Sequence, residues 1–418
     1  MLGLFRTRRS RTAAPAVAAL TLGVALVGAS LGGSASAAPA APNLPADAAP
    51  AGDDFYVPPA SIPADAKPGD ILRWRPSKAG PPTARSLANA WQVMYVSQDA
   101  LGKPDAVTGT ILVPKSGDAK TLPIVGFGPG TSGPAFRCAP SKFIDEGAFY
   151  EQAAVNGMLK AGYAVAMTDY EGYHPDPKMT YIAGKSMGSA VIDSVRAAQR
   201  FSEAGLSADA KVLFRGYSQG GGAAMWAGQM QPDYAPELKL VGVAGGGVPA
   251  DLTKVAVGLN SKRGFGFLMT ALVGLDNAYP ELKLSSYFKD DGQQVFSNMV
   301  ANDCTLELLT NYAGHKTTDY LTKSPFLDAP WLARVKENLL GGTAIKAPVF
   351  HYHGTNDDIV PFAQDDTLHQ AYCKLGVQET WKTYPVDHIT GVGRANDDVL
   401  AFMASAVKGE APSSNCSA

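Results

Sequence analysis

The chain has 418 residues, of which 46% are hydrophobic and 18% are charged, a globular composition that excludes a wholly disordered protein. The net charge is −2 and no basic tract occurs, which argues against a nucleic-acid-binding protein. At about 150 residues per domain, this length indicates two or three domains, or one large α/β domain with an insertion.

Residues 1–37 have the pattern of a secretory signal peptide. Four arginines precede an uncharged, Ala-rich stretch at 13–31, and Ala35-Ser36-Ala37 supplies a cleavage site. An N-terminal membrane anchor is the alternative, but the stretch is weakly apolar and the cleavage site follows it directly. Cleavage near Ala37 predicts a secreted, extracellular chain with a charge of −6, because the four arginines leave with the peptide. We expect no transmembrane segment in the mature chain.

Four cysteines remain in the mature chain. An exported protein uses cysteines as disulfides more often than as catalytic thiols, so we expect two disulfides, for which three pairings are possible. No C-x-x-C motif occurs, so we expect neither a metal site nor a redox site. The cysteines are Cys138, Cys304, Cys373 and Cys416.

Strand and helix patterns follow an Ala/Pro-rich segment at 38–60, which we expect to be extended or mobile. Residues 90–97 and 106–113 alternate in polarity and predict paired strands. Helical patterns occupy 147–161 and 186–204. This alternation predicts an α/β fold with a mostly parallel sheet that is covered on both faces. The short runs that predict the remaining strands are 122–127, 163–167, 211–214, 238–244, 348–351 and 379–384.

The alternation stops between residues 251 and 344, where no buried strand is predicted. Amphipathic and Gly/Phe-rich stretches fill this segment instead. We therefore expect an inserted helical subdomain at 251–344, between the two parts of the core at 61–250 and 345–418.

Two segments match the nucleophile motif G-x-S-x-G, which needs small residues because its Ser lies on a strained strand-to-helix turn. Gly216-Tyr217-Ser218-Gln219-Gly220 follows a good buried strand and precedes small residues that allow close helix packing. The second match, centred on Ser186, begins a long amphipathic helix, where a helix N-cap explains the Ser. We therefore expect Ser218 to be the nucleophile of a serine hydrolase.

An acid and a histidine follow Ser218 in the order that α/β-hydrolases use. Asp357 lies just after the predicted strand at 348–351, with the adjacent Asp358 as the alternative acid; an ordinary Asx turn would also explain this segment. His388 follows the last predicted strand, 31 residues after Asp357 and 170 after Ser218. The predicted triad is Ser218, Asp357 and His388.

The ordered set of motifs resembles the secretory lipase family of the α/β-hydrolase superfamily. The motifs are GYSQGG at the elbow, HGTNDDIVP at the acid, DHITG at the histidine, and CAPS at residues 138–141. The resemblance covers residue 89 to the end and implies an α/β-hydrolase core, a helical cap at 251–344 and the same triad. It also implies the disulfides Cys138–Cys304 and Cys373–Cys416, and hydrolysis of carboxylic esters such as acylglycerols.

The oxyanion hole is expected to combine one backbone N–H with a second donor, which is either a backbone N–H or the Thr hydroxyl near Thr131. One donor is Gln219, just after the nucleophile. The other is expected in the loop after residues 122–127, where Pro129 replaces the His of many hydrolases; Gly130 and Thr131 remain as candidates. A plain Gly-rich loop is the alternative explanation of this segment.

The sequence therefore predicts a secreted serine carboxylesterase or lipase that needs no cofactor. Its partner is an acyl-ester substrate, contact with a lipid interface fits this activity, and acyl-chain length and oligomeric state stay open. Acyl transfer to a cell-envelope acceptor and an inactive hydrolase-fold binding protein are the alternatives, and an intact triad argues against the second. Four glycines of the cap are candidate hinges, and an apolar series either lines an acyl channel or forms the cap's own core. These residues are Gly258, Gly264, Gly266 and Gly274, and Phe265, Phe267, Leu268, Met269, Leu272 and Val273.

Overall fold

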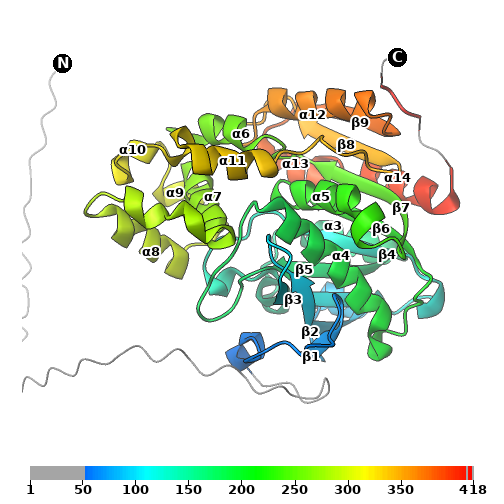
Figure 1. Ribbon diagram of the computed structural model, residues 1–418. Coiled ribbons are helices and arrows are strands. Elements are labelled where there is room, and N and C mark those ends of the chain that lie inside the picture. Colours follow the sequence, from blue (N-terminus) through cyan, green and yellow to red (C-terminus); the bar gives the residue numbers. More distant parts are fainter. Residues whose placement is uncertain (1–51, 411–412, 417–418) are drawn as a thin grey trace, which may run out of the picture. The chain divides into compact units, whose positions relative to one another are not determined.

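The computed structural model describes residues 52–410 and 413–416, so the expected signal peptide lies outside the described residues. Nine strands of the described chain form one sheet in the order β1-β2-β3-β5-β4-β6-β7-β8-β9 (Figure 1). Antiparallel pairs join β1 (Ile71–Pro76), β2 (Ala88–Gln98), β3 (Pro104–Pro114) and β5 (Ala164–Tyr170). Parallel pairs join β5 to the rest: β4 (Ile124–Gly128), β6 (Lys211–Tyr217), β7 (Lys239–Gly246), β8 (Val349–Gly354) and β9 (Glu379–Tyr384).

Every predicted strand is present, and the mostly parallel α/β sheet is confirmed. The edge strand β1 was not predicted, because Arg73 and Arg75 interrupt its short apolar pattern. The structure buries Arg73, whose Nη1 donates to the carbonyl of Asp54 at 3.4 Å, and pairs Arg75 Nε with Gln92 Oε1 at 2.6 Å.

Two apolar layers cover the sheet. Helices α4 (Gly184–Arg200), α5 (Gln219–Tyr234) and α12 (Phe362–Lys374) contribute to one buried cluster. Side chains of α2 (Pro140–Glu146), α3 (Gln152–Lys160) and α14 (Asn396–Lys408) contribute to the other, with α1 (Pro82–Leu87) and α13 (His388–Arg394) at its margin. Short 3-10 helices complete the described chain: Gly52–Tyr56, Ala119–Thr121, Phe136–Cys138, Ser202–Ala204, Pro280–Leu282, Leu284–Tyr287 and Pro325–Leu327.

Three local expectations were wrong. The helix expected at 147–161 begins only at Gln152, as α3, because Gly147 adopts φ 74° and is the C-cap of the preceding helix α2. Ser186 lies inside α4 and is not its N-cap. In the segment expected to be extended or mobile, Phe55 and Tyr56 are buried against Ala139, and the Tyr56 hydroxyl lies 2.9 Å from that of Ser141.

Helices fill the chain between β7 and β8, where an isolated bridge between Phe288 and Leu321 is the only β-pairing among the described residues. Figure 1 shows these helices gathered together beside the sheet, and they share a hydrophobic cluster of their own. They are α6 (Leu252–Leu259), α7 (Phe265–Ala278), α8 (Gly292–Asn302), α9 (Thr305–Asn311), α10 (Thr317–Tyr320) and α11 (Ala329–Glu337). We refer to residues 251–344 as the helical segment.

Close packing explains two of the glycines in this segment. A Cβ on Gly266 would lie 2.3 Å from the carbonyl oxygen of Leu308, and one on Gly274 would lie 2.4 Å from that of Tyr181. Glycine therefore lets α7 approach two other segments of backbone. Across the described residues, the structure contains no helix with the length and apolar character of a membrane span.

Candidate active site

Ser218 occupies a sharp turn between β6 and α5. Its backbone has φ 58° and ψ −123°, a conformation that a residue with a Cβ rarely adopts. The turn places Ser218 at the first turn of α5, with its N–H bonded to the carbonyl of Gly246 at 2.8 Å. This geometry is that of the strained elbow which the motif predicted.

Neighbouring backbone explains why the elbow needs glycine. A Cβ on Gly216 would lie 2.1 Å from the carbonyl oxygen of Gly220, and one on Gly220 would lie 1.9 Å from that of Gly128. Both distances are well inside van der Waals contact. Larger residues at either position would therefore displace the turn that presents Ser218.

The structure brings Ser218, His388 and Asp357 together. The Ser218 Oγ lies 2.9 Å from His388 Nε2, and Asp357 Oδ2 lies 2.6 Å from His388 Nδ1. His388 begins α13, where the side chain of Asp387 caps the helix by accepting the N–H of Thr390 at 2.8 Å. Three loops that follow β6, β8 and β9 therefore meet at the carboxyl ends of their strands, as expected for a parallel sheet.

Asp357, and not the alternative Asp358, faces the imidazole of His388. Its Oδ1 accepts the N–H groups of Ile359 at 3.0 Å and Val360 at 2.7 Å. Burial raises the pKa of Asp357, but contacts with His353 and His388 outweigh burial and hold that pKa well below its ordinary value. Asp358 is largely exposed and lies 3.6 Å from Arg263.

The second motif match has no such arrangement. Ser186 is buried, and its hydroxyl donates to Glu171 Oε2 at 2.5 Å and lies 2.9 Å from Thr180 Oγ1. Neither partner is a histidine. Burial raises the pKa of Glu171 to about 8, which favours its protonated form at neutral pH and makes it a poor base.

Two of the three predicted oxyanion donors have free N–H groups. In the part of the chain that the structure describes, the N–H groups of Gln219 and Thr131 have no hydrogen-bond acceptor. The N–H of Gly130 differs from expectation, because it donates to Glu151 Oε2 at 2.7 Å. The Thr131 side chain is also engaged, with its Oγ1 2.7 Å from the hydroxyl oxygen of Tyr181.

Two pockets meet at Ser218. The narrow pocket has a volume of about 40 Å³ and an apolar lining from α6, α7 and the loop before α12, which includes Leu252, Phe267 and Leu268. The wider pocket has a volume of about 670 Å³ and is lined by His388 and Thr131, among others. Of the apolar series in α7, Phe267 and Leu268 therefore face the narrow pocket, whereas Phe265, Met269 and Leu272 are buried in the helical segment's own cluster.

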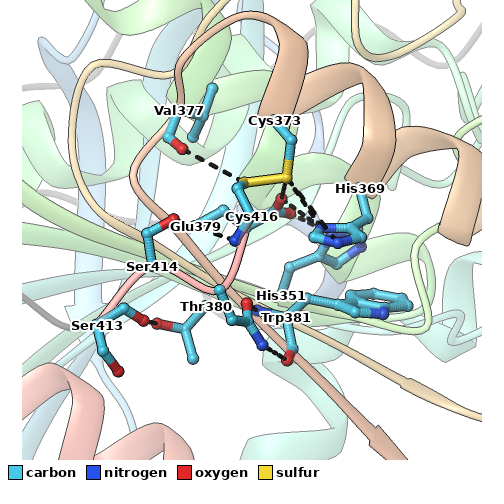
Figure 2. The surroundings of a disulfide bond; sticks show 11 residues. His351, His369, Cys373, Val377, Glu379, Thr380, Trp381, Ser413, Ser414 and Cys416 are labelled. Carbon is cyan, nitrogen blue, oxygen red and sulfur yellow. Dashed lines mark hydrogen bonds and ion pairs between the residues drawn. A yellow bond between two sulfur atoms is a disulfide. The ribbon is translucent and has the colours of Figure 1, made fainter. Parts of the chain in front are cut away.

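The disulfides join Cys138 to Cys304 and Cys373 to Cys416, the pairs that the resemblance implied. The first lies beside the Thr131 loop, because the N–H of Thr305 donates to the carbonyl of Ser132 at 3.0 Å. The second lies beside His369 and Glu379 (Figure 2). These four side chains have the residue types of a metal site, but the two sulfurs are bonded to each other and so are not thiolate ligands.

Sequence reasoning missed Glu151 and the partners of His351 and His353. Nothing in the local sequence indicates a role for Glu151, which is buried and accepts the N–H of Gly130. The two histidines are two residues apart on β8, a spacing that places their side chains on the same face of the strand. Their acidic partners Asp365 and Glu379 lie on other elements, so spacing alone could not identify them.

Comparisons with known proteins agree with this architecture. Residues 140–412 match the family described as Secretory lipase. Lipase 6 of Candida albicans is 32% identical over 355 residues, which cover 78% of this chain and 74% of that protein. A protein of Malassezia furfur named secreted triacylglycerol lipase LIP4 is 30% identical, over 81% of this chain and 66% of its own length.

Solved structures share the fold. Candida antarctica lipase A in its closed state superposes with a TM-score of 0.77 at 24% identity, covering 89% of this chain and 88% of that chain. A rice cell wall degrading esterase, LipA from Xanthomonas oryzae, gives a TM-score of 0.63 at 21% identity, over 82% and 97%. The mixed sheet and its helices are those of an α/β-hydrolase. The chain belongs to the secretory lipase family and is a carboxylic ester hydrolase.

Proposed function

We propose that the protein is an exported lipase or esterase in which Ser218, His388 and Asp357 form the catalytic triad. The observation that carries this proposal is the continuous contact from Ser218 Oγ to His388 Nε2 at 2.9 Å, and from His388 Nδ1 to Asp357 Oδ2 at 2.6 Å. A carboxylate accepts at Nδ1, so Nε2 is free to take the proton of the Ser hydroxyl.

The reaction follows from this proton path. His388 removes the proton of Ser218 as the Oγ attacks the ester carbonyl carbon, and the carbonyl oxygen becomes an oxyanion. The free N–H groups of Gln219 and Thr131 are the donors we assign to that oxyanion. The alcohol leaves with the proton from His388, and water then attacks the acyl-enzyme by the same route in reverse.

The helical segment is the proposed cap, and its narrow pocket the proposed site of the acyl chain. The pocket begins at Ser218 and continues between α6 and α7, with an apolar lining that suits a hydrocarbon chain. The wider pocket, which includes Glu151 and Asn396, offers polar groups to the alcohol part of the ester. The printed name of the Malassezia furfur relative supports acylglycerols as the substrate class.

Export is proposed from the signal-peptide pattern, with cleavage near Ala37. Two disulfides in the described chain support an oxidising destination, because such bonds persist outside the reducing cytosol. N-terminal sequencing of the protein recovered from culture medium tests the cleavage site.

The triad is tested by Ser218→Ala, with Ser186→Ala as the matched control. We expect Ser218→Ala to lower turnover of p-nitrophenyl butyrate by about 10⁴- to 10⁶-fold and to abolish labelling by a fluorophosphonate probe. Ser186→Ala should retain both, since the Ser186 hydroxyl faces Glu171 and Thr180. Retained activity in folded Ser218→Ala protein would refute the proposed triad.

A further inference from the structure

A buried chain of alternating acids and histidines continues from Asp357 away from Ser218. His353 on β8 lies between Asp357 and Asp365, and His351 lies between Asp365 and Glu379. The four side chains beyond Asp357 have no exposed surface at all. We call Asp357, His353, Asp365, His351 and Glu379 the buried ion chain. Its contacts are made by side chains from β8, β9, α12 and the loop that follows β8.

The hydrogen-bond partners of His353 fix its charge. The Nδ1 of His353 lies 2.5 Å from Asp365 Oδ2, and its Nε2 lies 2.9 Å from the carbonyl oxygen of Val360. A carboxylate and a carbonyl accept hydrogen bonds and do not donate them, so both ring nitrogens must carry a proton. His353 is therefore an imidazolium, with one positive charge, in a site closed to water.

The same argument applies to His351, which lies between two carboxylates. Its Nε2 is 2.8 Å from Asp365 Oδ1 and its Nδ1 is 2.7 Å from Glu379 Oε1. Glu379 also accepts from His369 at 2.7 Å, next to the disulfide of Cys373 and Cys416 (Figure 2). The ion chain thus alternates in charge from Asp357 to Glu379, which makes its burial tolerable because each ion has an opposite neighbour.

His353 also touches the proposed catalytic acid. Its Nε2 lies 3.2 Å from Asp357 Oδ2, the same oxygen that is 2.6 Å from His388 Nδ1. Oδ1 of Asp357 is occupied by two backbone N–H groups, so Oδ2 alone faces the two histidines. A positive charge at this place holds Asp357 ionised and offsets part of the negative charge that His388 experiences.

We propose that His353 is a positioning residue for the triad: its buried charge, fixed by Asp365 and Val360, orients Asp357 and offsets part of the negative charge that Asp357 presents to His388. This inference rests on the proposed function. Burial lowers the pKa of His353, but its contacts with Asp365 and Asp357 outweigh burial and raise it to about 10, in agreement with the geometry. His388 must be neutral to accept the Ser218 proton, so His353 extends activity toward acid.

The charged groups near this site are few. Asp357 and Asp365 face His353 directly, from the loop after β8 and from α12. His388 lies beyond Asp357, and His351 lies beyond Asp365. Other titratable groups lie near His388. The ring centre of Tyr217 is 5.1 Å from that of His388, and Asp358 Oδ1 lies 3.5 Å from the His388 backbone nitrogen. Asp387 precedes His388 in the chain, and Arg263 lies 3.6 Å from Asp358.

The test is the acid limb of kcat/KM against pH, measured with p-nitrophenyl butyrate. His353→Gln retains an N–H near Val360 and removes the charge. His388 Nδ1 and His353 Nε2 both contact Asp357 Oδ2, which places them about 6 Å apart at most, so losing the charge should move the limb upward by roughly one to two pH units. His351→Gln is the matched control, because it removes a charge of the same ion chain that does not touch Asp357.

Three outcomes would overturn the inference: an unmoved limb in His353→Gln, an equal shift in His351→Gln, or a downward shift. His353→Asn provides a second variant that removes the same charge with a shorter side chain, and its limb should also move upward. If neither variant folds, ¹⁵N NMR of histidine-labelled Ser218→Ala protein should show both His353 ring nitrogens protonated from pH 5 to 8. A neutral His353 there refutes the inference, whereas active Ser218→Ala refutes the proposed function.

Discussion

Ala271→Phe should lower activity on esters of longer acyl chains relative to activity on short ones. Ala271 lies on α7 next to Leu268, lines the narrow pocket and is only partly buried, so a phenyl ring there projects into the pocket. The pocket is narrow, so a phenyl ring and a hydrocarbon chain would compete for the same space. The variant should therefore bind the ester group at Ser218 and exclude the far end of the acyl chain.

The size of the effect follows from the apolar lining. Each methylene that enters such a pocket contributes about 0.8 kcal/mol, or roughly a fourfold gain in kcat/KM. Four further methylenes, from butyrate to octanoate, give an upper limit of about 200-fold. In Ala271→Phe the ratio of kcat/KM for the two p-nitrophenyl esters should fall toward one, while activity on butyrate changes little.

Met269→Ala is the control for this prediction. Met269 is fully buried in the helical segment's cluster and does not line the pocket, so its truncation should lower the free energy of unfolding by about 2–5 kcal/mol without changing the ratio. If Ala271→Phe leaves the ratio unchanged and Met269→Ala alters it, the acyl chain does not occupy the narrow pocket.

Three further predictions concern the acid, a disulfide and pH. Asp357→Asn should lower kcat by about 10⁴-fold, whereas Asp358→Asn should stay within about tenfold of the parent; equal losses in steady-state kinetics would contradict the assignment. Replacing both residues of the Cys138–Cys304 disulfide by Ser should lower the free energy of unfolding by about 2–5 kcal/mol in urea titrations. The change should also lower kcat, because the disulfide lies beside the Thr131 loop. An unchanged kcat would show that the disulfide does not position that loop. The pKa values of His351 and His353 are raised to about 9 and about 10. The stability that they contribute to the fold is complete below the unfolded pKa of about 6.5 and is lost as pH rises through 9 and 10. A melting temperature that does not fall between pH 7 and 10 would contradict this.

Much of the fold was predictable because its signals are local. The predicted run 379–384 matches β9 residue for residue. The elbow was predictable from Gly216 and Gly220, where close backbone contacts leave no room for a Cβ atom. The order of acid and histidine after Ser218 follows from a rule of topology, so Asp357 and His388 could be proposed before any contact was known.

The remainder depended on partners that are distant in sequence. The N–H of Gly130 is taken up by Glu151, 21 residues later, so the loop's own residues gave no indication that this donor is occupied. Nothing in the local sequence around the strand predicted at 348–351 indicated a role for His351 or His353. Their charge follows from Asp365 and Glu379, which no spacing rule connects to them. The choice between Asp357 and Asp358 likewise needed the direction of two adjacent side chains.

The Cys138–Cys304 bond restricts how substrate can gain access. It ties the N-cap of α9 to the loop that carries Thr131, with the two Cα atoms 5.6 Å apart. Any opening of the helical segment must therefore keep α9 at that distance, so the segment cannot lift away as one piece. Movement would then pivot about this fixed point. Helix α7 packs closely on α9 through Gly266 and Leu308, which leaves α6 as the wall of the narrow pocket that can swing. The proposed oxyanion donors would then hold their position while the entrance changes shape.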